Sequence, residues 1–138
     1  MINEGVIKTV AAFMNSKGGT LGIGISDDGD IPGIQPDLDY KKQDLDGCQN
    51  WLATLLINAM GQVSVAKNVD NRFGAVEENV VCLVDVVPSP TPVYADTVKG
   101  KEVFYVRVGN TTRILSGGEM VEYIGRHFRL ITITQSTA

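Results

Sequence analysis

Apolar side chains recur at steps of three and four residues in several segments of the chain, which is the spacing of one face of an α-helix. The first segment runs from Val6 to Met14, and the pair Gly18-Gly19 predicts where it ends. The second runs from about Asp46 to Met60 and is stopped by Gly61. The third follows Ser116-Gly-Gly-Glu119, a spacing of Ser and Glu that is typical of a helix N-terminus. The sequence therefore predicts a helix in each segment.

Between these helices, apolar and polar residues alternate or form short apolar runs, which predicts strands. The run Val80–Val87 is almost entirely apolar and predicts a central strand covered on both faces. Asp28-Gly29 predicts a turn, and Arg72-Phe73-Gly74 is interpreted as a connection. The predicted strands are Thr20–Ser26, Asp30–Ile34, Val63–Val69, Ala75–Glu77, Val80–Val87, Val93–Ala95, Glu102–Val108 and, near the C-terminus, Leu130–Gln135.

The order of these elements predicts an α+β fold, with a single mixed or mostly antiparallel sheet packed with about three helices. We expect residues 1–138 to form one domain, in which residues 129–138 are a terminal strand or a tail. No apolar run is long enough to span a membrane, and no secretory signal is visible at the N-terminus. We therefore expect a cytoplasmic protein without a membrane partner.

Charge and cysteine content narrow the classes of function. The net charge is −4 and the isoelectric point about 4.9, whereas a nucleic-acid-binding protein usually carries a basic surface. Local clustering of cations can still supply such a surface. Cys48 and Cys82 lie in apolar patterns without the spacing of metal ligands, so we interpret them as buried thiols. The one histidine, His127, is expected to complement the dipole of the last helix.

Glycines cluster around the strand predicted at Thr20–Ser26. A phosphate-binding loop places its glycines between a strand and a following helix. Here the order is helix, Gly18-Gly19, strand, and Gly22 and Gly24 fall inside the strand segment. We therefore predict that these glycines allow close packing of backbone or helix against the strand. A face without bulky side chains could also admit a flat ligand or a nucleic-acid backbone.

Two motifs resemble a known family. The segment IKTVAAFMNSKGGTLGIGISDDGDIPGI resembles the core signature of the Schlafen AlbA-type domain, a divergent relative of the Alba nucleic-acid-binding fold. The segment PSPTPVYADTVKGKEVFYVRVGNTTRIL is similar to the family's proline-rich P-V-Y segment and the strand after it. The likeness extends from about Gly5 to Phe128. It implies nucleic-acid binding, in a family whose bacterial members are commonly described as transcriptional regulators and sometimes as ATP-binding proteins.

Some animal members of this family cleave structured RNA, and the resemblance carries part of that chemistry to this chain. The cleaving domains hold a divalent metal with carboxylates, one of which matches the acidic pair Asp27-Asp28, with Asp27 the better positional match. The others belong to a glutamate-containing segment before the first helix, where this chain has only Glu4. We therefore expect no catalysis and no cofactor, and interpret Asp27 and Asp28 as turn residues. A divalent metal is implied only if the chain is a nuclease.

The second motif supplies candidates for nucleic-acid binding. Tyr105 and Arg107 are two residues apart on one strand and share a face, and Arg113 follows the turn at Asn110. Arginine suits phosphate oxygens, hydroxyl groups add donors, and tyrosine can stack on a base. Alternatively, Arg107 pairs with a carboxylate and Tyr105 is half-buried. The candidate residues are Lys17, Tyr105, Arg107, Asn110, Thr111, Thr112 and Arg113.

The sequence leaves several functional hypotheses open. The first is a non-catalytic nucleic-acid-binding module of a transcriptional-regulator-like protein, in which Arg107 and Arg113 capture phosphate. The second is a protein-interaction or oligomerisation domain, which the acidic isoelectric point and an open sheet edge favour. For this hypothesis we predict a homodimer, with Leu130–Gln135 adding to the edge. An RNA endonuclease of Schlafen type and an ATP-binding regulator are the remaining alternatives.

Overall fold

The protein is described by a computed structural model that covers residues 2–26, 28–41, 44–98 and 100–128. In this part of the chain, two three-stranded antiparallel sheets, ordered β1-β3-β2 and β4-β5-β6, pack with five helices. The elements are α1 (Ile2–Met14), β1 (Gly19–Ile23), α2 (Gln35–Lys41), α3 (Leu45–Met60), α4 (Gln62–Asn68), β2 (Val69–Val76), β3 (Asn79–Val86), β4 (Ala95–Val98), β5 (Lys101–Val108), β6 (Thr111–Leu115) and α5 (Gly117–His127).

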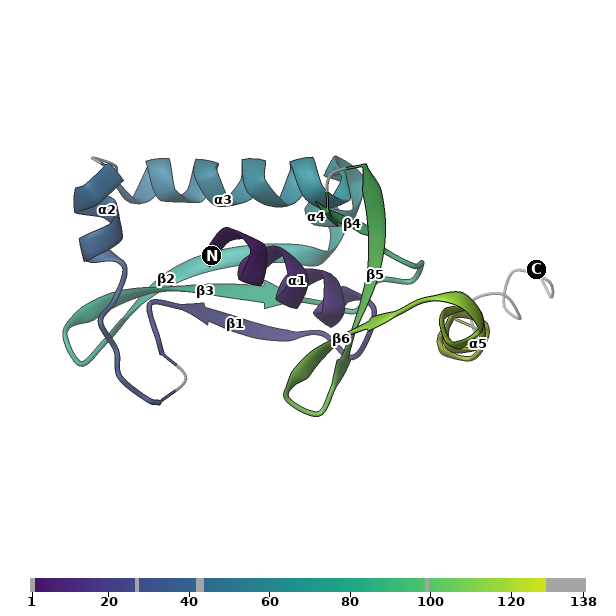
Figure 1. Cartoon of the computed structure of the whole chain (residues 1–138). Coiled ribbons are helices and arrows are strands. Elements are labelled where there is room, and N and C mark those ends of the chain that lie inside the picture. Colours follow the sequence, from purple (N-terminus) through teal and green to yellow (C-terminus); the bar gives the residue numbers. More distant parts are fainter. Residues whose placement is uncertain (1, 27, 42–43, 99, 129–138) are drawn as a thin grey trace.

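The predicted α+β class is confirmed, but the strands form two sheets rather than a single one. The break falls at Pro88, Pro90 and Pro92, between β3 and β4. Proline has no backbone N–H to donate to a strand ladder, so this segment cannot continue the first sheet. Figure 1 shows the strands of the two sheets running in different directions, with α1 close to both.

Helix α1 and helix α3 supply most of the helical part of the core. The side chains of Val10 and Met14 on α1 are completely buried, as is that of Val84 on β3. Leu52 and Leu56 of α3 complete the same cluster. α1 contacts β1 and β3 of the first sheet and all three strands of the second. It therefore joins the two sheets, and Figure 1 shows it between α3 and the first sheet.

The prediction of a central strand at Val80–Val87 is confirmed, because β3 lies between β1 and β2. Gly19 and Val69 both pair with Val86, so β3 has a strand on each edge. Cys82 and Val81 point to opposite faces of the sheet, and both are almost fully buried. The middle of β3 is thus covered on both faces.

Three predictions of local structure are wrong. Val63–Val69 was expected to be a strand, but α4 occupies most of it, with Val63 exposed and Val65 buried. The segment Arg72-Phe73-Gly74 belongs to β2 instead of a connection. Asp30–Ile34 is not a strand; it is held by bonds from Gly33 N to the Gly24 carbonyl and from Ile34 N to the Val80 carbonyl. The strand predicted at Leu130–Gln135 lies outside the described residues.

The prediction of close packing is confirmed for Gly24, although Gly24 lies just after β1 and not inside the strand as expected; Gly18, at the end of α1, lies equally close to backbone. Gly18 has φ of +75°, and a Cβ atom there would lie 2.5 Å from the Val86 carbonyl oxygen. Gly24 has φ of +99°, and its Cβ would lie 2.9 Å from the carbonyl carbon of Gly33. A side chain at either position is excluded by backbone that cannot move aside. β1 is followed by α2 only after residues 24–34, and no Gly-Lys-Ser or Gly-Lys-Thr of a phosphate-binding loop precedes that helix.

Asn15 connects three parts of the chain that are distant in sequence. Its side chain is completely buried just after α1. The Nδ2 group donates to the carbonyl oxygens of Val93, at 2.8 Å, and Tyr105, at 2.9 Å. The Oδ1 atom accepts from the Val93 N–H at 2.8 Å. One amide therefore fixes the end of α1 to the proline-rich segment and to β5.

Replacing Asn15 with alanine should destabilise the protein strongly, because it leaves the buried backbone groups of Val93 and Tyr105 without partners. We expect a loss of about 3–5 kcal/mol in the free energy of unfolding, measured by urea denaturation. The exposed residue Asn50 on α3 provides a matched control, and Asn50→Ala should change stability by less than about 0.5 kcal/mol. Equal midpoints for the two variants would contradict the role given to Asn15.

Candidate nucleic-acid interface

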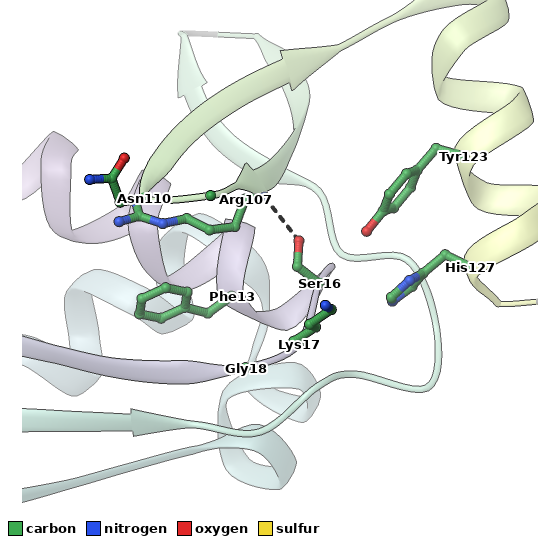
Figure 2. A pocket seen from close by; sticks show the side chains of 9 residues that line it. Phe13, Ser16, Lys17, Gly18, Arg107, Asn110, Tyr123 and His127 are labelled. Carbon is green, nitrogen blue, oxygen red and sulfur yellow. Dashed lines mark hydrogen bonds between the residues drawn. The ribbon is translucent and has the colours of Figure 1, made fainter.

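A pocket of about 600 Å³ opens where the turn after α1, the turn between β5 and β6, and the end of α5 come together. We call it the Arg107 pocket. Figure 2 shows Arg107 and Phe13 on one side of it and Tyr123 and His127 on the other. Its lining residues are Phe13, Ser16, Lys17, Gly18, Arg107, Gly109, Asn110, Tyr123 and His127. Among the described residues, this lining contains two cations, the Asn110 amide and hydroxyl groups, and neither Asp nor Glu.

Arg107 is held in place without being neutralised. Its guanidinium carbon lies 5.3 Å from the centre of the Phe13 ring, a cation–π contact. Its Nη1 donates to the Thr112 hydroxyl at 2.8 Å, and its backbone N–H donates to the Ser16 hydroxyl at 2.9 Å. Within the described residues, ion pairs form elsewhere, and no carboxylate lies within 4.0 Å of this guanidinium. The alternative that a described carboxylate pairs with Arg107 is therefore wrong.

The C-terminal end of α1 borders the same pocket, and the carbonyl groups of Phe13, Met14 and Asn15 there accept hydrogen bonds. The Phe13 carbonyl accepts from the backbone N–H groups of Ser16 and Gly18. The Met14 carbonyl accepts from Ser89 N at 2.8 Å, and the Asn15 carbonyl accepts from the Tyr123 hydroxyl. Unpaired carbonyls at a helix end carry partial negative charge that would repel an anion. Because these are paired, the charged groups of the pocket are chiefly Lys17 and Arg107.

The opposite wall comes from α5. The rings of Tyr123 and His127 stack with centres 5.0 Å apart and planes 14° apart, while Tyr123 also contacts Phe104 edge-on. His127 is exposed at the mouth of the pocket. It was expected only to complement the helix dipole, so sequence reasoning missed its place in this site. The spacing of four residues between Tyr123 and His127, which puts both on one helix face, is the signal that could have found the pair.

The structure brings together some of the predicted residues and separates others. Lys17, Arg107 and Asn110 line the Arg107 pocket, and Thr112 holds Arg107. Arg113 pairs across the hairpin with Val106, whereas Thr112 pairs with Arg107. Because neighbouring residues of a strand alternate between faces, Arg113 and Thr111 lie on the face opposite Arg107. The expectation that Arg107 and Arg113 capture phosphate stays a prediction, but the two side chains do not share one face of the hairpin.

Tyr105 is not a surface residue. Its side chain is only 2% exposed, and its hydroxyl is hydrogen-bonded to that of Thr97. A base cannot stack on a ring in this position. The ring is also more deeply buried than the alternative interpretation, a half-buried Tyr105, predicted. The reason is that β5 packs on α1. Arg107, near the end of the strand, is half-buried and lines the pocket.

The acidic loop after β1 has the features of a turn. The Ser26 hydroxyl and the Asp30 N–H donate to the Asp28 carboxylate, and these bonds hold the pKa of Asp28 below its usual range. The turn role predicted for Asp28 is thus confirmed, while Asp27 lies outside the described residues. No group of three His, Cys, Asp or Glu side chains suited to a metal ion occurs in the described part of the chain.

The two cysteines form no disulfide; Cys82 is buried as predicted, whereas Cys48 is only half-buried, so the prediction is wrong for Cys48. Cys82 is buried, and desolvation raises the pKa of its thiol to about 11. At neutral pH it is therefore protonated and a poor nucleophile. Among the helices of the described ranges, none is both long and apolar enough to cross a bilayer.

Comparison with known proteins identifies the family. The family model described as Schlafen, AlbA_2 matches residues 1–116, so the chain belongs to the Schlafen AlbA_2 family, as the sequence motifs indicated. The fold is similar to the crystal structure of the DIP2311 protein from Corynebacterium diphtheriae, with a TM-score of 0.63 and 22% sequence identity. The likeness covers 91% of this chain but 22% of that protein. No curated protein matches the chain.

Replacing Tyr123 with phenylalanine should loosen the α5 wall of the pocket. The variant keeps the ring that stacks on His127 but leaves the Asn15 carbonyl without the Tyr123 hydroxyl, at a cost of about 1 kcal/mol. We expect faster hydrogen exchange of the α5 backbone amides. Tyr94→Phe is the matched control, because the Tyr94 ring also contacts Phe104. If α5 exchanges equally fast in both variants, the hydroxyl does not anchor the helix.

Proposed function

We propose that this domain binds nucleic acid through its phosphate groups, and that the Arg107 pocket is the binding site. The proposal is based on the state of the Arg107 guanidinium. It is held by Phe13 and Thr112 and has no carboxylate partner among the described residues. A fixed, uncompensated arginine is suited to phosphate, because its planar fork of N–H groups matches two phosphate oxygens.

The neighbouring groups complete a site for an anion. Lys17 adds a second positive charge, and the side-chain amide of Asn110 adds a neutral donor. The overall charge of −4 does not oppose this arrangement, since no acidic residue of the described ranges lines the pocket. Long-range repulsion from the rest of the surface is screened beyond about 10 Å at moderate salt.

The family assignment is the basis for a proposal about the wider biological role of the chain. We propose that the chain is a non-catalytic module of a cytoplasmic protein that resembles transcriptional regulators and needs no resident metal or other cofactor. The family assignment supports nucleic-acid binding. The pocket contributes the chemistry for phosphate, which is common to DNA and RNA.

Binding should depend on salt in proportion to the phosphates that are neutralised. With Lys17 and Arg107 each contacting one phosphate, the slope of log K against log salt concentration should be about −1.5, measured with a labelled single-stranded oligonucleotide. Arg107→Ala should weaken binding about tenfold at low salt, because charge-assisted hydrogen bonds are lost, and should make the slope shallower by about 0.7.

Arg72→Ala is the matched control for this experiment. It removes the same charge from an arginine that is already paired with Asp85 at 2.8 Å on the other sheet, so affinity should change little. The proposal fails if the protein binds no oligonucleotide at tens of micromolar in low salt. It also fails if the Arg72 variant loses as much affinity as the Arg107 variant.

A second candidate function is self-association, favoured by the edge strand β6. This strand is last in the order β4-β5-β6, and Ile114 on it is 61% exposed. An open strand edge with an exposed apolar side chain favours pairing with another strand.

If β6 mediates a homodimer, light scattering should give twice the monomer mass, and Ile114→Lys should give the monomer mass while the fold is kept. The charged side chain would disfavour burial at a strand pair. A monomeric mass for the unaltered protein at working concentration would rule out this candidate.

A further inference from the structure

The Arg107 pocket is bordered by a flat group on each of two sides. On one side the Arg107 guanidinium lies over the Phe13 ring, and on the other the His127 ring stacks on Tyr123. Figure 2 shows these two pairs on opposite sides of the pocket, with Lys17 between them. Planar surfaces and cations therefore meet in one concave site.

The histidine ring is the surface most accessible to a ligand. Tyr123 stacks on it in a nearly parallel arrangement, and the edge-on contact with Phe128 has ring centres 4.7 Å apart. The residue is nevertheless exposed, whereas Phe128 is only 7% exposed. The Tyr123 hydroxyl bond to the Asn15 carbonyl fixes this wall relative to α1. His127 is thus an aromatic surface that is already oriented before a ligand arrives.

Size and chemistry together indicate one class of ligand. A volume of about 600 Å³ is in the range of sites that enclose one small organic molecule. In a duplex the bases are paired and stacked on one another, so a duplex offers this concave site only its backbone. An unpaired nucleotide offers both a phosphate for the cations and a base for a ring.

We infer that the Arg107 pocket takes one unpaired nucleotide of a single-stranded nucleic acid, with its base stacked on His127, its phosphate bound by Arg107, and the adjoining phosphate of the strand contacted by Lys17. This inference rests on the proposed function and adds that the site distinguishes single strands from duplexes. Stacking on an aromatic ring is tolerant of base identity, so the site selects for strandedness more than for sequence.

The decisive comparison uses two oligomers with the same number of phosphates. One is a short labelled thymidine oligomer and the other is an abasic oligomer of the same length, with binding measured by fluorescence anisotropy at fixed low salt. The thymidine oligomer should bind about tenfold more tightly, which is within the range measured for stacking of one base. The duplex form should bind with an affinity similar to that of the abasic oligomer.

Two variants at one position separate stacking from charge. His127→Ala should remove the advantage of the thymidine oligomer over the abasic one. His127→Phe should keep that advantage, because it preserves a flat ring without a titratable nitrogen. Arg126→Ala, which alters an exposed neighbour on the same helix, should also keep it. Circular dichroism of each variant reports whether the fold is intact.

The outcomes distinguish the inference from the proposed function. If the two oligomers bind equally and Arg107→Ala weakens both, phosphate binding stands and the inference is overturned. If none of the oligomers binds, both are overturned. Loss of the thymidine advantage in both His127→Phe and His127→Ala would also overturn stacking. Free thymidine monophosphate in excess should displace the oligomer. If the monophosphate binds but no oligomer does, the site binds free nucleotides and not nucleic-acid strands.

Discussion

The buried side chain of Asn15 determines how the parts of this domain meet. Its amide is hydrogen-bonded to both the N–H and the carbonyl of Val93. Water cannot replace these bonds, because the side chain is completely buried. The same amide reaches the Tyr105 carbonyl on β5. The second sheet and the proline-rich segment that leads to it are thus fixed to the end of α1 by a set of hydrogen bonds whose loss would leave polar groups unpaired in the core.

The Asn15 carbonyl and the two residues after Asn15 connect this arrangement to the surface. Ser16 accepts from the backbone of Arg107, which positions the strand end that carries the guanidinium. The carbonyl of Asn15 accepts from Tyr123, which positions the wall formed by α5. Lys17 follows directly and lines the pocket. The turn that holds the fold together therefore also assembles the candidate binding site, so stability and function are connected through the same few residues.

Much of the fold could be predicted from the sequence because local patterns decided it. The helical period of α1 and α3, the apolar run of β3 and the glycines that end α1 each gave the observed element. The prediction failed at α4, where valines two apart suggested a strand, while the helix exposes one and buries the other. The division into two sheets depends on the path of the proline-rich segment, which local patterns do not determine.

The candidate site was only partly predictable for the same reason. Arg107, Asn110 and Lys17 were found because their chemistry is visible in the sequence. The burial of Tyr105 depends on the packing of α1, and the separation of Arg113 from Arg107 depends on the register of β5 and β6. His127 joined the site through the position of α5, which is fixed by a contact between residues 108 positions apart.

The most direct test of the account is to map nucleic-acid binding on the protein by nuclear magnetic resonance, following the backbone amide signals while a single-stranded oligonucleotide is added. We predict that the backbone amide signals of Lys17, Arg107, Asn110 and His127 shift together, while those around Arg72 and Asp85 on the other sheet do not shift. Shifts confined to the acidic loop around Asp28 or to the outer face of α3 would contradict it.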